Sequence, residues 1–190
     1  IAKFKKTDDA IVFSSGYLAS IGTISSIMNK DDIIFSDELN HACLIDGARL
    51  SRSKIVIYKH SDMKDLESKL KKFKASNGKK MIISDSVFSM DGDIAPLVEL
   101  AQICQSEDAW FMLDDAHGFG ILGPPGGGAA LDAELNQQQV QIYMGTLGKA
   151  VGCHGAFVAG SDTLIEAIIQ FARSYIYTTA ITPSVAAASL

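Results

Sequence analysis

The sequence predicts an α/β fold, and two observations lead to that class. Short runs of β-branched and aromatic residues recur along the 190-residue chain, and continuous apolar runs of this kind are typical of strands covered on both faces. Between these runs lie longer stretches whose apolar residues recur at helical spacing. Regular alternation of the two patterns favours strands and helices that succeed one another within one domain.

The expected elements follow in chain order. A helix is expected from the turn at residues 13–18 through Met28. Six strands are expected, centred on residues 33–35, 55–58, 81–83, 110–113, 141–144 and 156–159. Two amphipathic helices are expected between them, at residues 62–73 and 96–105.

Three segments bear on the organisation of the chain. Pro124 to Gly128 predicts a loop inside one domain, because the same α/β rhythm continues on both sides of it. The lysine-rich residues 69–80 predict a solvated helix face and a turn. The chain begins at Ile1 without a signal-peptide pattern and ends at Leu190 within an alanine-rich, helix-like stretch, so we expect a piece of a longer chain.

Composition and charge narrow the classes of partner. With 17 basic and 22 acidic residues the formal charge is −5, which disfavours nucleic acid or anionic lipid and favours a small-molecule partner. No apolar run approaches the roughly 18 residues that a membrane span requires. The 3 cysteines are odd in number and have no Cys-x-x-Cys spacing. This argues against a disulfide framework and a structural zinc site, so we expect a reducing, cytoplasmic location.

Polar residues follow four of the expected strands: Asp37, Asp85, Asp114 and Thr146. In open α/β sheets, ligands bind outside the carboxyl ends of the strands, so a site is expected where these side chains meet. The alternative is that the strand ends are polar because they reach solvent.

Two candidate motifs lie in the first part of the chain. Small residues around Ser15 and Gly16 precede the first helix. Free backbone N–H groups and the helix dipole would hold a phosphate there, and an ordinary N-cap and turn is the alternative. His41 would stack on a flat ligand, transfer a proton or fill a polar loop. Zinc is a poor explanation, because His41 and Cys43 find no matching ligand spacing among the other histidines.

Two more motifs directly follow later strands. Asp114 ends a hydrophobic strand and His117 lies three residues further on. A buried carboxylate there would need a cationic partner such as a protonated heterocycle, while a helix N-cap or a divalent metal site is the alternative. Lys149 lies between Gly148 and Ala150 in a glycine-rich segment whose spacing is not that of a Walker A loop. We expect this lysine to be poorly solvated and suited to amine chemistry, with a surface lysine in a turn as the alternative.

Together the four motifs are more specific than any one of them. A phosphate turn, a histidine, an Asp-x-x-His pair and a lysine between glycines occur in that order, each near a strand end. Pyridoxal 5'-phosphate needs such a set: a helix N-terminus for its phosphate, a carboxylate for its ring nitrogen and a lysine for its aldehyde. The sequence therefore predicts a pyridoxal phosphate site.

The same segments resemble the α-oxoamine synthases, a family of fold-type-I pyridoxal phosphate enzymes, essentially from end to end. The segments that carry the resemblance are Phe13 to Leu18, Leu39 to Ala42, Val87 to Asp93, Leu113 to Gly118 and Gly145 to Gly152. The resemblance implies that residues 1–190 form a three-layer α/β/α large domain with a mostly parallel mixed sheet. It also implies that an N-terminal segment and a C-terminal small domain are absent from this chain.

The resemblance further implies a role for each matching residue. Lys149 would bond to the cofactor aldehyde, Asp114 would pair with the ring nitrogen and His41 would stack on the ring, so these three are the expected catalytic residues. The other implied cofactor contacts are Gly16 and Tyr17 at the phosphate, His117 near the phenolic oxygen, Ser89 and Thr146. Thr178 and Thr179 match a segment that reaches the cofactor phosphate of the neighbouring subunit, which implies a homodimer with shared sites.

Three segments, Asn40 to Leu44, His154 to Ala156 and Phe171 to Thr179, most resemble the family member that condenses L-alanine with a pimeloyl thioester. The thioester would be pimeloyl-CoA or pimeloyl-ACP, and the implied products are 8-amino-7-oxononanoate, carbon dioxide and the free thiol, in biotin biosynthesis. Glycine C-acetyltransferase, 5-aminolevulinate synthase and serine palmitoyltransferase are the alternatives within the family. A non-catalytic fragment or subunit is the alternative of another class, and the presence of Lys149 argues against it.

Overall fold

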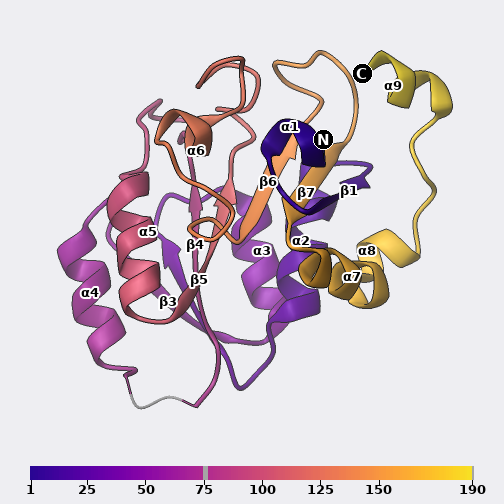
Figure 1. The fold of residues 1–190 in the computed structure, drawn as a ribbon. Helices are drawn as coiled ribbons and strands as arrows, with labels where there is room; N and C mark the ends of the chain where they lie inside the picture. The colour runs from indigo at the N-terminus through magenta and orange to yellow at the C-terminus, as the bar shows by residue number, and fades with distance from the viewer. Residues whose placement is uncertain (75–76, 190) are drawn as a thin grey trace.

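Seven strands form one sheet in the computed structural model, which describes residues 1–74 and 77–189 (Figure 1). Their order across the sheet is β1-β7-β6-β5-β4-β2-β3. The strands are β1 (Asp9–Phe13), β2 (Ile33–Asp37), β3 (Lys54–Tyr58), β4 (Lys80–Asp85), β5 (Ala109–Asp114), β6 (Ile142–Thr146) and β7 (Ala156–Gly160).

One strand, β7, runs against the others. It pairs antiparallel with β6 on one side and with β1 on the other, whereas β6, β5, β4, β2 and β3 pair in parallel. Because two reversals restore the direction, β1 runs parallel to β6, and its carboxyl end lies at the same edge of the sheet. The mostly parallel mixed sheet expected for this chain is confirmed.

Helices cover both faces of the sheet, which produces the predicted three-layer α/β/α arrangement. One face packs against α4 (Met63–Lys71), α5 (Leu97–Ser106) and α6 (Ala129–Asp132). The other packs against α2 (Gly16–Ile27), α3 (Ala42–Ser51), α7 (Asp162–Phe171) and α8 (Arg173–Ile176). Two short helices, α1 (Ala2–Lys5) and α9 (Pro183–Ala188), lie near the chain ends, and α9 stands apart from the body at the upper right of Figure 1.

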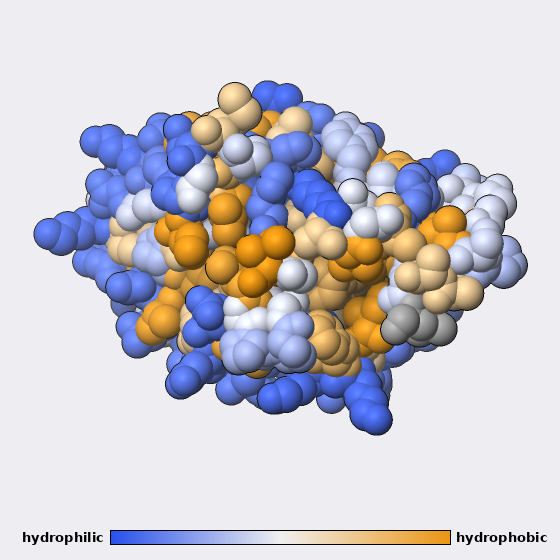
Figure 2. All heavy atoms as spheres, turned by 90° about the horizontal axis from the view of Figure 1, so that it is seen from above, coloured by the Kyte–Doolittle hydropathy of each residue, from blue (hydrophilic) through white to orange (hydrophobic). Residues whose placement is uncertain are grey.

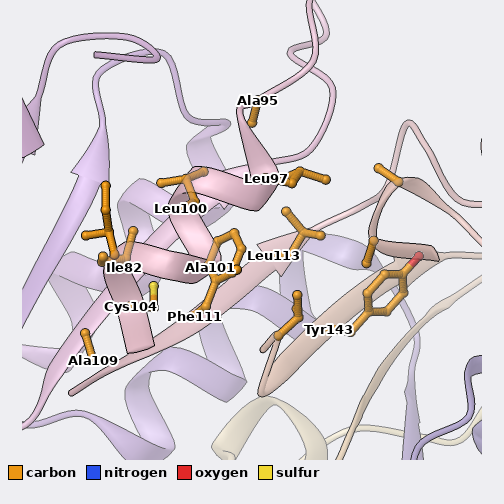
Figure 3. Close-up of a cluster of buried hydrophobic side chains, with 14 of the residues drawn as sticks. Ile82, Ala95, Leu97, Leu100, Ala101, Cys104, Ala109, Phe111, Leu113 and Tyr143 are labelled. Carbon is orange, nitrogen blue, oxygen red and sulfur yellow. The ribbon is translucent and has the colours of Figure 1, made fainter. Parts of the chain in front are cut away.

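Side-chain alternation along the strands divides the apolar core between the two faces. The strand residues that pack with α5 are drawn in Figure 3 and include Ile82, Phe111, Leu113 and Tyr143. Their neighbours in sequence pack on the α2 and α3 side: Met81, Ile83, Met112 and Ile142. Successive residues of a strand face opposite ways, so each continuous apolar run supplies both cores.

All six predicted strands are confirmed, with bounds that differ by no more than two residues at either end. The three predicted helices are confirmed as α2, α4 and α5, and residues 124–128 lie in the loop before α6 as expected. The prediction missed β1, because this five-residue strand begins with an acidic residue and its apolar part runs into the turn before α2. In the predicted lysine-rich face and turn, residues 69–71 belong to α4, whereas residues 75–76 lie outside the described residues, as does Leu190.

Within residues 1–74 and 77–189, no helix is both long enough and apolar enough to cross a membrane.

Candidate active site

The candidate site lies at the edge of the sheet where the parallel strands end. β4, β5 and β6 finish there with Asp85, Asp114 and Thr146, and the first two are paired across adjacent strands. Each of the three alternates in step with the residues of its strand that pack on α2 and α3, so all three point to that face. Asp37, the fourth predicted strand-end residue, alternates the other way and contacts His60 on the opposite face.

A cavity of about 210 Å³ opens at this edge. Figure 2 views the molecule from above, where apolar side chains gather in the middle of the surface within a hydrophilic rim. The cavity is lined by Gly16, Tyr17, His41, Cys43, Asp85, Asp114, Ala116, His117, Met144, Thr146 and Lys149. All three expected catalytic residues and most of the expected cofactor contacts therefore meet in one place.

Asp114 is a buried carboxylate of this cavity, with 3% of its surface exposed. Its Oδ1 accepts a hydrogen bond from the Ala116 N–H at 3.0 Å, and its Oδ2 accepts one from the Cys43 thiol at 3.4 Å. Burial raises the pKa of Asp114, and these hydrogen bonds and the positive charge of Lys149 oppose that rise. A cationic group brought to Asp114 would offset the cost of burying its negative charge.

Asp85 lies beside Asp114, and the sequence reasoning missed it as a site residue although its position at a strand end was noted. Its Oδ2 accepts a hydrogen bond from the backbone N–H of His41 at 2.6 Å. Burial, and after it the negative charge of Asp114, raises the pKa of Asp85. Two neighbouring buried carboxyl groups resist ionising together, so Asp85 retains its proton more readily than an exposed aspartate.

His41 caps the N-terminus of α3 and lines the cavity. Its Nδ1 accepts a hydrogen bond from the Cys43 N–H at 3.2 Å and lies 3.0 Å from the Cys43 Sγ. Because Nδ1 accepts from Cys43, Nε2 is the ring nitrogen of His41 that carries a proton. The Nε2–H group of this exposed side chain is thus available to a ligand. Cys43 was also missed, since a lone cysteine at the second position of a helix gives no signal of its own.

Lys149 and His117 form a pair, with 2.7 Å between Nζ and Nε2. Burial, followed by the electrostatic influence of the neighbouring Lys149 and His41, lowers the pKa of His117. His117 is therefore neutral at pH 7, and its Nε2 accepts a hydrogen bond from the lysine ammonium. The poor solvation predicted for Lys149 is wrong, because the side chain is exposed. It lies in a loop after β6 in which Gly148 and Gly152 have no side chains to cover it.

The N-terminus of α2 also faces the cavity. Ser15 is its N-cap, and the Ser15 Oγ accepts a hydrogen bond from the Leu18 N–H at 3.2 Å. The N–H groups of Gly16 and Tyr17, in the same first turn, have no acceptor within the helix. Because both residues line the cavity, an anion bound there would meet two backbone donors and the positive end of the helix dipole.

Thr146 supports the loop that carries Lys149. Its Oγ1 donates a hydrogen bond to the Gly155 carbonyl at 3.1 Å and accepts one from the Gly148 N–H at 3.3 Å. The two ends of the loop are therefore held together at the end of β6.

Three of the expected cofactor contacts lie outside this cavity. Ser89 is exposed in the turn between Val87 and Ile94. Thr178 and Thr179 line a separate cavity of about 540 Å³. Their roles, including contact with a neighbouring subunit, stay predictions.

The geometry suits a ligand with three features: an anionic group for the N-terminus of α2, a basic ring nitrogen for Asp114 and an electrophilic carbon for Lys149. Pyridoxal phosphate combines all three. The site is thus consistent with the cofactor predicted from the motifs.

The comparisons with known proteins agree with this geometry. Residues 1–190 match the family described as aminotransferase class I and II. Over 189 residues, the chain is 53% identical to 8-amino-7-oxononanoate synthase of Cellvibrio japonicus and 52% identical to that of Marinobacter nauticus. Each of these matches covers 100% of this chain and 47% of the relative, so the chain spans about half the length of the curated relatives it matches.

Solved structures show the same relationship. A serine palmitoyltransferase variant from S. paucimobilis with a bound PLP–myriocin aldimine has a TM-score of 0.93 and 34% identity, covering 99% of this chain and 47% of that one. The 8-amino-7-oxononanoate synthase of Francisella tularensis has a TM-score of 0.83 and 38% identity, covering 99% of this chain and 53% of that one. The resemblance stated from the motifs is confirmed. The chain belongs to the aminotransferase class I and II family.

Proposed function

We propose that this chain is the cofactor-binding large domain of a pyridoxal phosphate enzyme that condenses L-alanine with pimeloyl-CoA or pimeloyl-ACP. The products are 8-amino-7-oxononanoate, carbon dioxide and the free thiol, as in biotin biosynthesis. The observation that carries the proposal is the single cavity shared by Asp114, Lys149, His41 and His117. The substrates are supported by the curated relatives, which at 53% and 52% identity are named 8-amino-7-oxononanoate synthase.

The chemistry of Asp114 supports pyridoxal phosphate as the cofactor. Among the described residues, this carboxylate accepts hydrogen bonds from an amide N–H and a thiol, and a protonated ring nitrogen would give it a cationic partner in direct contact. Bound pyridoxal phosphate supplies an electron sink for the α-carbon of an amino acid. Asp114 would keep the ring nitrogen protonated, and the N-terminus of α2 would hold the phosphate through the N–H groups of Gly16 and Tyr17.

Lys149 has two tasks in this proposal. Its Nζ would bond covalently to the cofactor aldehyde and, after release by the incoming alanine, would remove the α-proton of the substrate as a general base. The neutral imidazole of His117, 2.7 Å away, holds the resulting ammonium by accepting its hydrogen bond.

His41 acts on the second substrate. Its ring would stack on the cofactor, and its Nε2–H would donate a hydrogen bond to the oxyanion that develops on the thioester carbonyl during attack. The backbone N–H of His41 donates a hydrogen bond to Asp85 at 2.6 Å. This bond fixes the position of the His41 backbone from which the ring extends.

The proposal extends to assembly and location. We place the enzyme in the cytoplasm as a homodimer, in which Thr178 and Thr179 reach the site of the neighbouring subunit. Both threonines are exposed in this chain, so they are accessible to a second copy.

The test compares wild type with Lys149→Ala in the protein at its full natural length, supplied with pyridoxal phosphate. Wild type is expected to develop a visible absorption band that borohydride bleaches, and to condense L-alanine with pimeloyl-CoA. Lys149→Ala is expected to lose the band and to slow condensation by at least about 10³-fold, as removal of a covalent group and general base requires. The matched control is Lys64→Ala, on the exposed side of α4, which should behave as wild type.

Two outcomes would count against the proposal. Undiminished condensation by Lys149→Ala would remove the role of the lysine. A panel of thioesters with alanine, glycine and serine tests the substrates separately, because a preference for glycine or serine would point to a sister activity while leaving the cofactor chemistry in place.

A further inference from the structure

A second buried carboxylate stands next to Asp114 and has no part in the proposed mechanism. Asp115 is 0% exposed. It follows Asp114 directly, and its side chain contacts Tyr143, which packs on the α5 side of the sheet. The two consecutive carboxylates therefore point to opposite faces.

Three donors from separate parts of the chain meet the Asp115 carboxylate. Its Oδ1 accepts a hydrogen bond from the Ser86 hydroxyl at 2.5 Å. Its Oδ2 accepts one from the Tyr143 hydroxyl at 2.5 Å and one from the Ala129 N–H at 2.8 Å. Burial raises the pKa of Asp115, and the hydrogen bonds from these three donors and the charge of Lys5 oppose that rise only in part.

Lys5 supplies a positive charge that acts on Asp115. Its ammonium lies 3.4 Å from the centre of the Tyr143 ring and donates a hydrogen bond to the Gly127 carbonyl. Burial lowers the pKa of Lys5 to about 8, partly opposed by the charge of Asp115. Lys5 is thus still mostly protonated at neutral pH and balances the buried carboxylate.

Two glycines close around this carboxylate, one at each end of the loop 118–128. A Cβ atom at Gly118 would lie 2.1 Å from the Asp115 Oδ1, and one at Gly128 would lie 2.0 Å from Oδ2. Any side chain would collide, and Gly128 also has a φ of +95° that favours glycine. The loop therefore starts and ends against Asp115.

The same loop reaches the catalytic pair. His117 directly precedes it, and a Cβ atom at Gly120 would lie 2.8 Å from that of Ala150, the residue after Lys149. A shift of the loop would thus move His117 from one side and the Lys149 loop from the other.

We propose that Asp115 is a positioning residue, which anchors both ends of the loop 118–128 and thereby holds His117 against Lys149. This inference rests on the proposed function for its effect on catalysis. The anchoring itself concerns only residues of this chain, so it can be measured without cofactor.

The test uses three variants in the protein at its full natural length. Asp115→Ala removes all three hydrogen bonds, and Tyr143→Phe removes one and keeps the ring. Asp115→Asn is the conservative variant, because its amide oxygen can accept from Tyr143 and Ala129 while its NH₂ donates to the Ser86 hydroxyl. The control is Asp31→Ala, whose side chain is exposed.

The first readout is hydrogen exchange of residues 117–128 in cofactor-free protein. Asp115→Ala is expected to accelerate hydrogen exchange of residues 117–128 roughly tenfold or more, because at least one charge-assisted hydrogen bond that holds the loop is lost. The second readout is the pH titration of the visible band with pyridoxal phosphate, whose midpoint should shift in Asp115→Ala and be restored in Asp115→Asn. The turnover number, kcat, should fall about tenfold in Asp115→Ala, while KM for alanine changes little.

Wild-type exchange at residues 117–128 in Asp115→Ala, or a general loss of stability with an unshifted titration, would overturn the inference. If Asp115→Ala does not fold, Tyr143→Phe is measured with the same readouts. Smaller changes in the same direction would support the inference, and the absence of any change would overturn it. If wild type itself forms no visible band, the proposed function fails, and the exchange measurement still decides whether Asp115 anchors the loop.

Discussion

Asn40 ties the segment after β2 to the end of β4, and replacing it would test what holds the cavity wall in place. Its Nδ2 donates to the Ser36 hydroxyl and to the Ile83 carbonyl, each at 2.9 Å, and its Oδ1 accepts from the Asp85 N–H at 3.0 Å. Asn40 is 5% exposed, so water has little access to replace these bonds. Asn40→Ala would break all three beside His41.

The expected cost follows from the bond count. A buried hydrogen bond between neutral groups has a net value of about 1 kcal/mol, so Asn40→Ala should lower the free energy of unfolding by about 3 kcal/mol. Ser36→Ala breaks one of the three and also the hydrogen bond that the Ser36 hydroxyl donates to the Asp37 carbonyl at 3.2 Å, so it should cost about 2 kcal/mol. The three hydrogen bonds of Asn40 therefore predict a larger loss of unfolding free energy in Asn40→Ala than in Ser36→Ala.

Urea unfolding of the protein at its full natural length would measure both costs, with Gln102→Ala on the exposed side of α5 as control. Hydrogen exchange gives the local reading, because the Asp85 amide that bonds to Asn40 should exchange roughly 100-fold faster in Asn40→Ala. A cost of Asn40→Ala no greater than that of Ser36→Ala, or unchanged exchange of the Asp85 amide, would contradict this expectation.

Two further predictions concern pH. His60 hydrogen-bonds to Asp37 at 3.0 Å and to Asp93 at 2.8 Å, and although burial lowers the pKa of His60, these bonds raise it above its ordinary value. The native state therefore binds this proton more tightly than the unfolded state, and the stabilisation is complete below about pH 6.5 and lost as pH rises through the native pKa. His60→Gln should cost about 1.5 kcal/mol of unfolding free energy near pH 6 and less near pH 8, and equal costs at the two pH values would contradict this. For Asp85, burial and the charge of Asp114 raise the pKa, so the native state keeps a proton that the unfolded state loses above about pH 4, and stability falls as pH rises from there. Asp85→Asn keeps an acceptor for the His41 N–H and should flatten that decline in urea unfolding; an unchanged slope would rule out Asp85 as its source.

The chemistry of the site was predictable where a motif followed a strand directly. Asp114, Thr146 and Lys149 come after long apolar runs, and the carboxyl ends of parallel strands must meet at one edge of the sheet. The sequence at the strand ends did not indicate to which face of the sheet each polar side chain points. β2 and β4 are buried on both faces, so neither has a polar and apolar alternation that would separate Asp37 from Asp85.

Other features depended on contacts between residues far apart in the chain. Lys149 is exposed because the loop after β6 lies at the surface. The amino-acid composition of that loop does not predict this position. Asp115 directly follows Asp114 in sequence, whereas its partners Ser86 and Ala129 come from distant segments. Local sequence patterns therefore predicted the helices, the strands and the chemistry of the motifs. The contacts that support the site could be identified only from the three-dimensional structure, because they join residues far apart in the chain.

The antiparallel strand β7 also has a consequence for synthesis of the protein. β1 pairs with β7, residue 9 with residue 160 and residue 13 with residue 156, and the N-terminus of α2 follows β1 directly. On the ribosome, the residues that would hold the phosphate thus emerge early but lack their neighbouring strand until most of this chain has been made. Pairing between such distant segments is also slow to form. The candidate site should therefore be completed late in folding, after β2 to β5 have already assembled.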